Sequence, residues 1–144
     1  MSNTILVGID GSEGALRALD FATSQARLSN QSLTVCYVIE WSPFTFNTPS
    51  ENEERHRRRE EELTRAHSDL IEPQLIRLAQ SGLNAEGLVR HGHAATVLKD
   101  LGAEIGASSI VIGRKGTSRL ASVMFGSVAG SLVQIADRPV TVVP

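Results

Sequence analysis

The sequence has one cysteine, no long hydrophobic run and almost no net charge, and each of these absences excludes a class of protein. The single Cys36 excludes an internal disulfide framework and a zinc site built on cysteines. No apolar run approaches the ~20 residues that cross a bilayer. The chain opens on an apolar stretch without the basic segment of a signal peptide. We therefore expect a soluble, cytoplasmic protein.

The charge balance argues against direct nucleic-acid binding. Lys and Arg number 14 and Asp and Glu number 16, for a net charge of -2, so there is no global basic field. The densest charge lies between Glu51 and Glu62, where acidic and basic residues alternate. Pairs at i,i+3 and i,i+4 indicate a solvated helix rather than a nucleic-acid patch. The 144 residues, 41% of them hydrophobic, favour one domain over 1–144 with a sizeable core.

Apolar runs and helical stripes alternate along the chain. Runs rich in β-branched residues predict strands at 4–9, 33–39, 83–90, 108–112 and 138–144. Stripes of apolar residues predict helices at 13–29, 51–80, 94–106 and 128–136, with Ser12 as an N-cap, Asn30 as an end and a kink at Pro73. The interrupted run at 83–90 and the proline-bracketed run at 138–144 suit edge strands.

This alternation predicts the fold class, an α/β protein in three layers. An open parallel five-stranded sheet would carry helices on both faces, joined by right-handed crossovers. Ligands of such sheets bind beyond the carboxyl ends of the strands, where the strand order reverses. The polar segments after the first strand, Asp10-Gly11-Ser12, and after the fourth, from Gly113 onward, would then face each other.

The glycine-rich segment after the fourth predicted strand indicates a phosphate-binding loop. Gly113, Gly116, Gly126 and Ser127 follow the spacing G-x2-G-x9-G-S. Glycines let the backbone approach a ligand, and a Gly-Ser pair at a helix N-terminus attracts anions. The loop also carries three cations, Arg114, Lys115 and Arg119. A plain surface loop ending in a helix cap is the alternative.

Neither common phosphate motif is present. The sequence contains no Gly-Lys-Ser/Thr of a Walker A loop, and Gly8, Gly11 and Gly14 are spaced three apart, unlike G-x-G-x-x-G. The chain instead resembles the universal stress protein family in its ATP-binding branch. The resemblance rests on residues 5–12, 110–113, 126–128 and 139–143, together with the glycine spacing. It implies a Rossmann-like, adenine nucleotide alpha hydrolase-like fold with strand order 3-2-1-4-5.

The resemblance also implies a role for each matching residue. Gly113 and Gly116 would let the backbone approach ribose and phosphate, and Gly126, Ser127 and Val128 would offer N–H groups and a hydroxyl to the triphosphate. Asp10 would lie near the nucleotide, and Val38 would present its backbone to adenine. The expected binding set is Ile9, Asp10, Gly11, Ser12, Val38, Ile112, Gly113, Arg114, Gly116, Gly126, Ser127 and Val128.

The implied function is an ATP-binding stress-response or regulatory protein, a nucleotide-dependent switch or sensor for a protein partner such as a transporter. ATP would bind with Mg2+, and residues 139–143 would form the interface of a homodimer or higher homo-oligomer. A slow ATP hydrolase is one alternative, with Asp10 the only candidate acid in the motifs and no catalytic residue assigned. A nucleotide-independent dimeric scaffold is another.

Three further residues invite a functional reading. His91 and His93 flank Gly92 and suit either the rim of a site or a metal; without a third ligand nearby, the rim is favoured. Cys36, in the middle of a predicted strand, is expected to be a small core residue. Residues 40–50 match no motif and are a candidate region for partner choice.

Overall fold

The fold is built on one sheet of five parallel strands, in the order β3-β2-β1-β4-β5. The computed structural model describes residues 4–40, 49–115 and 126–144, and for 49–52 the backbone only. The elements are β1 (Thr4–Ile9), α1 (Glu13–Ser29), β2 (Ser32–Ile39), α2 (Pro49–Ala66), a π-helical turn η1 (His67–Ile71), α3 (Glu72–Gln80), β3 (Ala85–His91), α4 (Ala94–Glu104), β4 (Ile110–Gly113), α5 (Ser127–Ile135) and β5 (Val140–Val143). The predicted strand order, with β3 and β5 at the edges, is confirmed.

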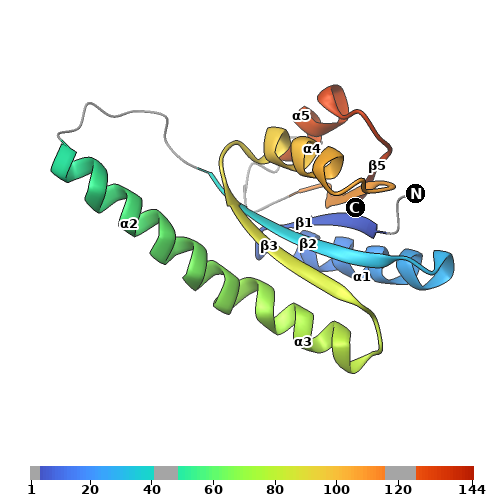
Figure 1. Ribbon diagram of the computed structural model, residues 1–144. Helices are drawn as coiled ribbons and strands as arrows, with labels where there is room; N and C mark the ends of the chain where they lie inside the picture. Colours follow the sequence, from blue (N-terminus) through green and yellow to red (C-terminus); the bar gives the residue numbers. More distant parts are fainter. Residues whose placement is uncertain (1–3, 41–48, 116–125) are drawn as a thin grey trace.

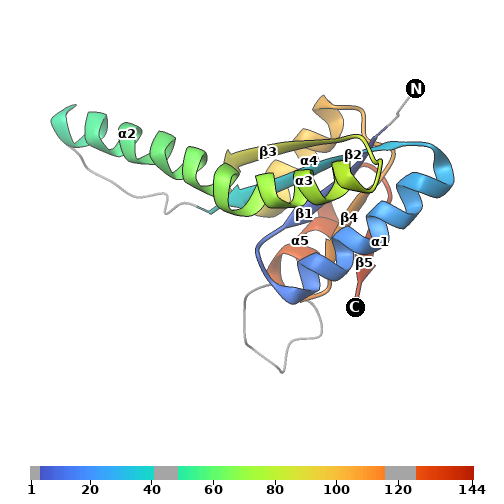
Figure 2. The same cartoon turned by 90° about the horizontal axis from the view of Figure 1, so that it is seen from below.

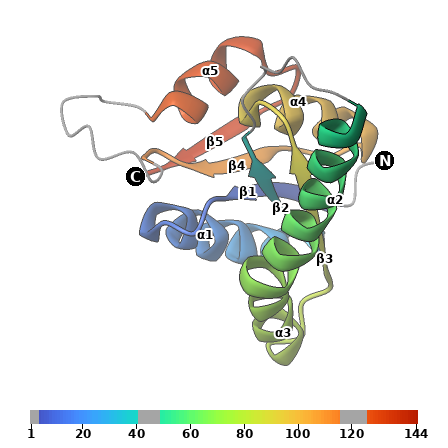
Figure 3. The same cartoon turned by 90° about the vertical axis from the view of Figure 1, so that its left-hand side faces the viewer.

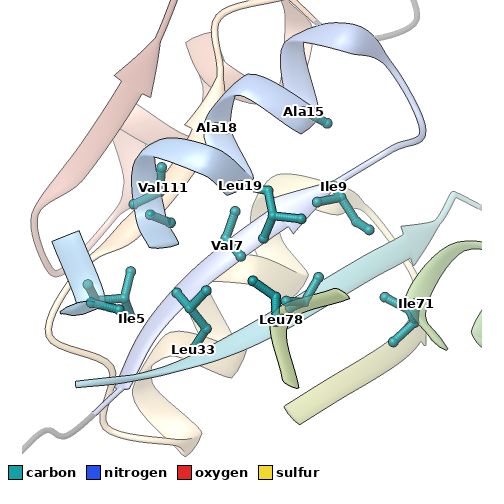
Figure 4. Packing of buried hydrophobic residues seen from close by; sticks show 13 residues of the cluster. Ile5, Val7, Ile9, Ala15, Ala18, Leu19, Leu33, Ile71, Leu78 and Val111 are labelled. Atoms are coloured by element: carbon teal, nitrogen blue, oxygen red, sulfur yellow. The ribbon is translucent and has the colours of Figure 1, made fainter. Parts of the chain in front are cut away.

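Helices cover both faces of the sheet, which gives the three layers predicted. Figure 3 shows α1 and α3 on one side of the strands and α4 and α5 on the other. A hydrophobic core lies on each side of the sheet, and successive residues of β1 pack into the two cores in turn. Val7 packs with α1 and η1, whereas its neighbour Leu6 packs with α4 and α5. In Figure 4, side chains of β1, β2, α1 and α3 converge on the first of these cores.

The first helix begins and ends where its local sequence predicts. The Ser12 hydroxyl accepts a hydrogen bond from the N–H of Ala15 at 3.1 Å, which caps the N-terminus of α1. At the other end Asn30 takes a left-handed conformation with φ 55°. These caps fix α1 directly after β1, so the turn at 10–12 lies at the carboxyl end of the sheet.

The long charged segment forms a nearly continuous rod of α2, η1 and α3, which extends past the end of the sheet (Figures 1 and 2). The sequence predicted a kink at Pro73; the structure has the π turn η1, which ends two residues before this proline. There the N–H of Glu72 donates to the carbonyl of His67, five residues back. A π turn widens the helix locally, which accommodates a proline ring without ending the helix.

Four of the five strands differ from their predicted bounds by one or two residues. β2 begins at Ser32 rather than at 33, and β5 covers Val140–Val143 rather than 138–144. The fourth begins at Ile110 rather than at 108, although Ser108 and Ser109 still exchange backbone hydrogen bonds with β1. The third runs from Ala85 to His91, two residues later at its start than predicted. All of these shifts fall at strand ends, where bounds are least sharply defined.

Gly87 interrupts the pattern of β3 for a packing reason. A Cβ built at Gly87 would collide with the side chain of Ile71 and lie 3.0 Å from Cδ1 of Leu75. Ile71 is fully buried, so it has little room to move. The glycine therefore lets the η1–α3 rod approach the edge of the sheet.

We expect Gly87→Ala to destabilise the protein by about 1–3 kcal/mol, because the added methyl overpacks the site. Urea unfolding followed by circular dichroism measures this. The matched control Glu86→Ala, exposed on the same strand, should change stability by less than about 0.5 kcal/mol. Combining Gly87→Ala with Ile71→Ala should cost less than the sum of the two single changes. Additive losses would show that the two sites do not compete for space.

Candidate functional site

A cavity of about 440 Å³ opens at the carboxyl ends of β1, β2 and β4. The first turns of α4 and α5 close it on the face of the sheet that these two helices cover. Most of the binding residues predicted from the sequence line it, namely Ile9, Asp10, Ser12, Val38, Ile112, Gly113, Gly126, Ser127 and Val128. Residues outside the predicted set complete the lining: Gly8, Ala15, Cys36, Tyr37, Glu40, Ala94, Leu98, Lys115 and Ala129.

Three predicted binding residues are not placed in this lining. Gly11 adjoins it and has φ 82°, a conformation that favours glycine, so it shapes the turn after β1. Arg114 contributes backbone hydrogen bonds rather than a surface of the cavity. Gly116 lies outside the described residues, as does Arg119.

The two ends of the glycine-rich segment are joined by the backbone. The N–H of Gly126 donates to the carbonyl of Arg114 at 2.7 Å, and the N–H of Arg114 donates to the carbonyl of Val143, also at 2.7 Å. Gly126 is the N-cap of α5, and the N–H of Gly130 donates to its carbonyl at 3.0 Å. The Gly126 N–H, for which the family resemblance implied a contact with the triphosphate, is therefore engaged within the protein. Ser127, Val128 and Ala129 line the cavity, and their N–H groups precede the first hydrogen bond within the helix.

β4 and the first turn of α1 meet backbone to backbone beside the cavity. A Cβ at Gly113 would lie 2.9 Å from the carbonyl atoms of Gly14, and a Cβ at Gly14 would lie 2.5 Å from the carbonyl oxygen of Lys115. Both positions therefore require glycine. Sequence reasoning missed Gly14, although the spacing of Gly8, Gly11 and Gly14 was its visible signal.

Asp10 is held in a local network at the end of β1. Its Oδ1 accepts hydrogen bonds from both the N–H and the hydroxyl of Ser12, with the N–H bond at 3.0 Å. Because Ser12 also caps α1, one short turn positions the carboxylate and starts the helix. The arrangement places a negative charge at the cavity where β1 ends.

A second carboxylate of the cavity follows the neighbouring strand β2. Oε1 of Glu40, just past β2, accepts the N–H of Ala94 at the start of α4, at 3.3 Å. His93, the N-cap of α4, makes no side-chain cap bond, so Glu40 takes that role from 54 residues away. Sequence reasoning did not find Glu40, because no local pattern links it to α4.

His91 and His93 lie in different environments. Nε2 of His91 is 3.2 Å from Oε2 of Glu62, and 11% of its side chain is exposed, so it joins α2 to the end of β3. His93 is exposed. In the described part of the chain, no group of three or more His, Cys, Asp or Glu residues is arranged to hold a metal ion. Among the same residues, no helix is both long enough and apolar enough to cross a membrane.

A cavity at the carboxyl ends of parallel strands, beside the strand where the order reverses, is the ligand site of doubly wound α/β proteins. Comparison with known sequences narrows this class. Residues 1–144 match the universal stress protein family, and the chain belongs to that family. It is 30% identical to the universal stress protein YxiE of Bacillus subtilis, over 99% of each chain. It spans about half the length of several mycobacterial universal stress proteins that it also matches.

Solved structures agree with the fold. The universal stress protein UspA from Lactobacillus plantarum superposes with a TM-score of 0.83 at 24% identity, covering 100% of this chain and 99% of that one. A universal stress protein from Archaeoglobus fulgidus, solved in complex with dAMP, superposes with a TM-score of 0.61 at 27% identity, covering 98% and 97%. The family therefore includes a member with a bound nucleotide.

Cys36 lies at the floor of the cavity but is fully buried, as expected of a core residue. Burial raises the pKa of its thiol to about 12, against a smaller opposing effect of Arg90. At pH 8 the thiol is thus protonated and inaccessible. We expect an aromatic disulfide reagent at pH 8 to modify the folded protein at least about a hundredfold more slowly than the protein in urea. Rapid modification of the folded protein would contradict this burial.

Proposed function

We propose that this protein binds ATP with Mg2+ in the cavity and acts as a nucleotide-dependent regulatory switch for a protein partner in a stress response. The observation that carries the proposal is that the first residues of α5, Ser127 and Val128, line the cavity at the N-terminus of that helix. Such a helix end binds phosphate through its N–H groups and its dipole. The nucleotide in the Archaeoglobus fulgidus relative supports the same class of ligand.

The size and charge of the cavity suit a nucleotide. Its 440 Å³ falls within the ~300–1,000 Å³ of sites for small molecules and cofactors. Lys115, in the lining beside Gly113, would offset phosphate charge. Val38 would face the base at the end of β2. The phosphates would then lie toward α5 and the base toward α4.

A magnesium ion in this site would depend on the nucleotide for most of its ligands. Mg2+ is usually held by one or two carboxylates together with phosphate oxygens and water. Asp10 lines the cavity where β1 ends and would supply the protein carboxylate. Bound there, the ion would neutralise phosphate charge.

Binding rather than hydrolysis is the proposed activity. Hydrolysis requires a group that positions and activates water. The acidic residues of the described lining are Asp10 and Glu40; Oδ1 of Asp10 is already engaged by Ser12, and Oε1 of Glu40 by the N–H of Ala94. ATP recovered intact after prolonged incubation would agree with this proposal, and turnover abolished by Asp10→Asn would instead favour the slow hydrolase.

The proposed switch has a route through the backbone. A ligand at α5 would bias the position of Gly126, which Arg114 links to Val143 at the end of β5. A ligand shifts a conformational equilibrium only if it binds one of the two states more tightly. Contacts of the nucleotide with the N-terminus of α5 would supply this difference in affinity. We propose that β5, an edge strand, carries the signal through a homodimer interface formed by residues 139–143.

We expect Gly126→Val to weaken ATP binding at least about tenfold, or about 1.4 kcal/mol, in isothermal titration calorimetry. Gly126 has φ -64° and ψ 161°, which valine also adopts, so the effect would come from the side chain in the cavity rather than from strain. Gln134→Val, exposed on the same helix, is the matched control and should bind normally. Unchanged affinity in Gly126→Val would overturn the site, and absence of binding by the unaltered protein would favour the nucleotide-independent scaffold.

We expect sedimentation velocity to show a dimer that Thr141→Lys converts to a monomer. A lysine in the middle of an edge strand opposes pairing with a second strand. Ser24→Lys, exposed on α1, adds the same charge away from β5 and should leave the dimer intact. A Thr141→Lys protein that is folded and still dimeric would place the interface elsewhere.

A further inference from the structure

Three helices begin at the cavity. Ser12 caps α1 with its own side chain, and the other two helix starts, of α4 and α5, differ in how they are capped. α4 begins at Ala94 and α5 at Ser127, and both residues line the cavity. Each helix start presents N–H groups and the positive end of a dipole, so each alone would attract an anion. Two equal anion sites would leave the orientation of a phosphate-bearing ligand undetermined.

Glu40 removes this equivalence. Its Oε1 accepts the N–H of Ala94 at 3.3 Å, so a carboxylate of the protein itself occupies the start of α4. The start of α5 has no side-chain cap, and Gly126 at that position has no side chain to provide one. A phosphate near Glu40 would meet like charge, whereas a phosphate at α5 would meet N–H groups and Lys115.

Glu40 also retains capacity to bind a ligand. An ionised carboxylate only accepts hydrogen bonds and has about four acceptor sites on its two oxygens. One of these is used by Ala94, and the residue as a whole is exposed and lines the cavity. The chemical group that suits the remaining sites is a hydrogen-bond donor, and the uncharged end of a nucleotide presents such a group on its base.

We propose that Glu40 is a specificity-determining residue, which accepts a hydrogen bond from the exocyclic amino group of the base and keeps the phosphates at α5. This inference rests on the proposed binding of ATP in the cavity. It adds a side-chain hydrogen bond to the base, in addition to the backbone contact proposed for Val38. Glu40 thus selects ligands whose base donates a hydrogen bond at that edge.

The test compares ATP with purine riboside triphosphate, which lacks the 6-amino group, by calorimetry on the full chain. A hydrogen bond to a charged group contributes ~1.5–3 kcal/mol, so the unaltered protein should bind ATP at least about tenfold more tightly than the analogue. Glu40→Ala should remove this preference, and Glu40→Gln, which keeps one acceptor oxygen, should restore part of it. Glu86→Ala, exposed and outside the cavity, is the control and should retain the preference.

The preference for ATP, rather than either affinity alone, is the decisive quantity. Loss of the cap on α4 could weaken both ligands equally, and this general effect cancels in the ratio. If the unaltered protein binds both ligands equally, or if Glu40→Ala keeps the preference, the role of Glu40 is overturned while ATP binding stands. If neither ligand binds, the proposed function fails and this inference fails with it.

Discussion

The close approach of β4 to the first turn of α1 is the constraint on which the rest of the site depends. Gly113 and Gly14 meet with only backbone between them, and Lys115 follows directly against the same turn. Side chains there would push the end of β4 away from α1. The cavity floor, the position of Arg114 and the start of α5 would then move with it. The absence of a Cβ atom at Gly113 and at Gly14 thus sets the position of β4, of the cavity and of the start of α5.

Around this contact, charge is distributed along the cavity rather than gathered at one point. Asp10 lies where β1 ends, Glu40 beyond β2, and Lys115 beyond β4. The helix dipole at α5 adds positive character where Gly126 leaves the N-cap without a side chain. The part of the cavity at α5 therefore favours an anionic group, whereas the part at Glu40 disfavours one. Such an arrangement suits a ligand that is charged at one end only.

The features that the sequence predicted correctly depend on local residue patterns or on the family resemblance. The strand order, the caps Ser12 and Asn30, and the edge position of β3 followed from local patterns and from the family resemblance, and the structure agrees with them. Gly14 and Glu40 were missed because their roles arise from contacts with distant segments, at Gly113 and Ala94. The engagement of the Gly126 N–H by Arg114 escaped prediction for the same reason. Packing across the fold determines which atoms remain for a ligand.

The rod of α2, η1 and α3 is long enough that a small change in its tilt would displace its far end by several ångströms. α2 has 18 residues, so at ~1.5 Å per residue it is about 27 Å long, and it extends beyond the sheet (Figure 1). Below it, η1 packs against β3 through Ile71 and Gly87. A tilt of about 10° at this fulcrum would carry the far end of α2 through about 5 Å, given the rise per residue of a helix. Small adjustments at the edge of the sheet are thereby magnified at the most remote point of the protein.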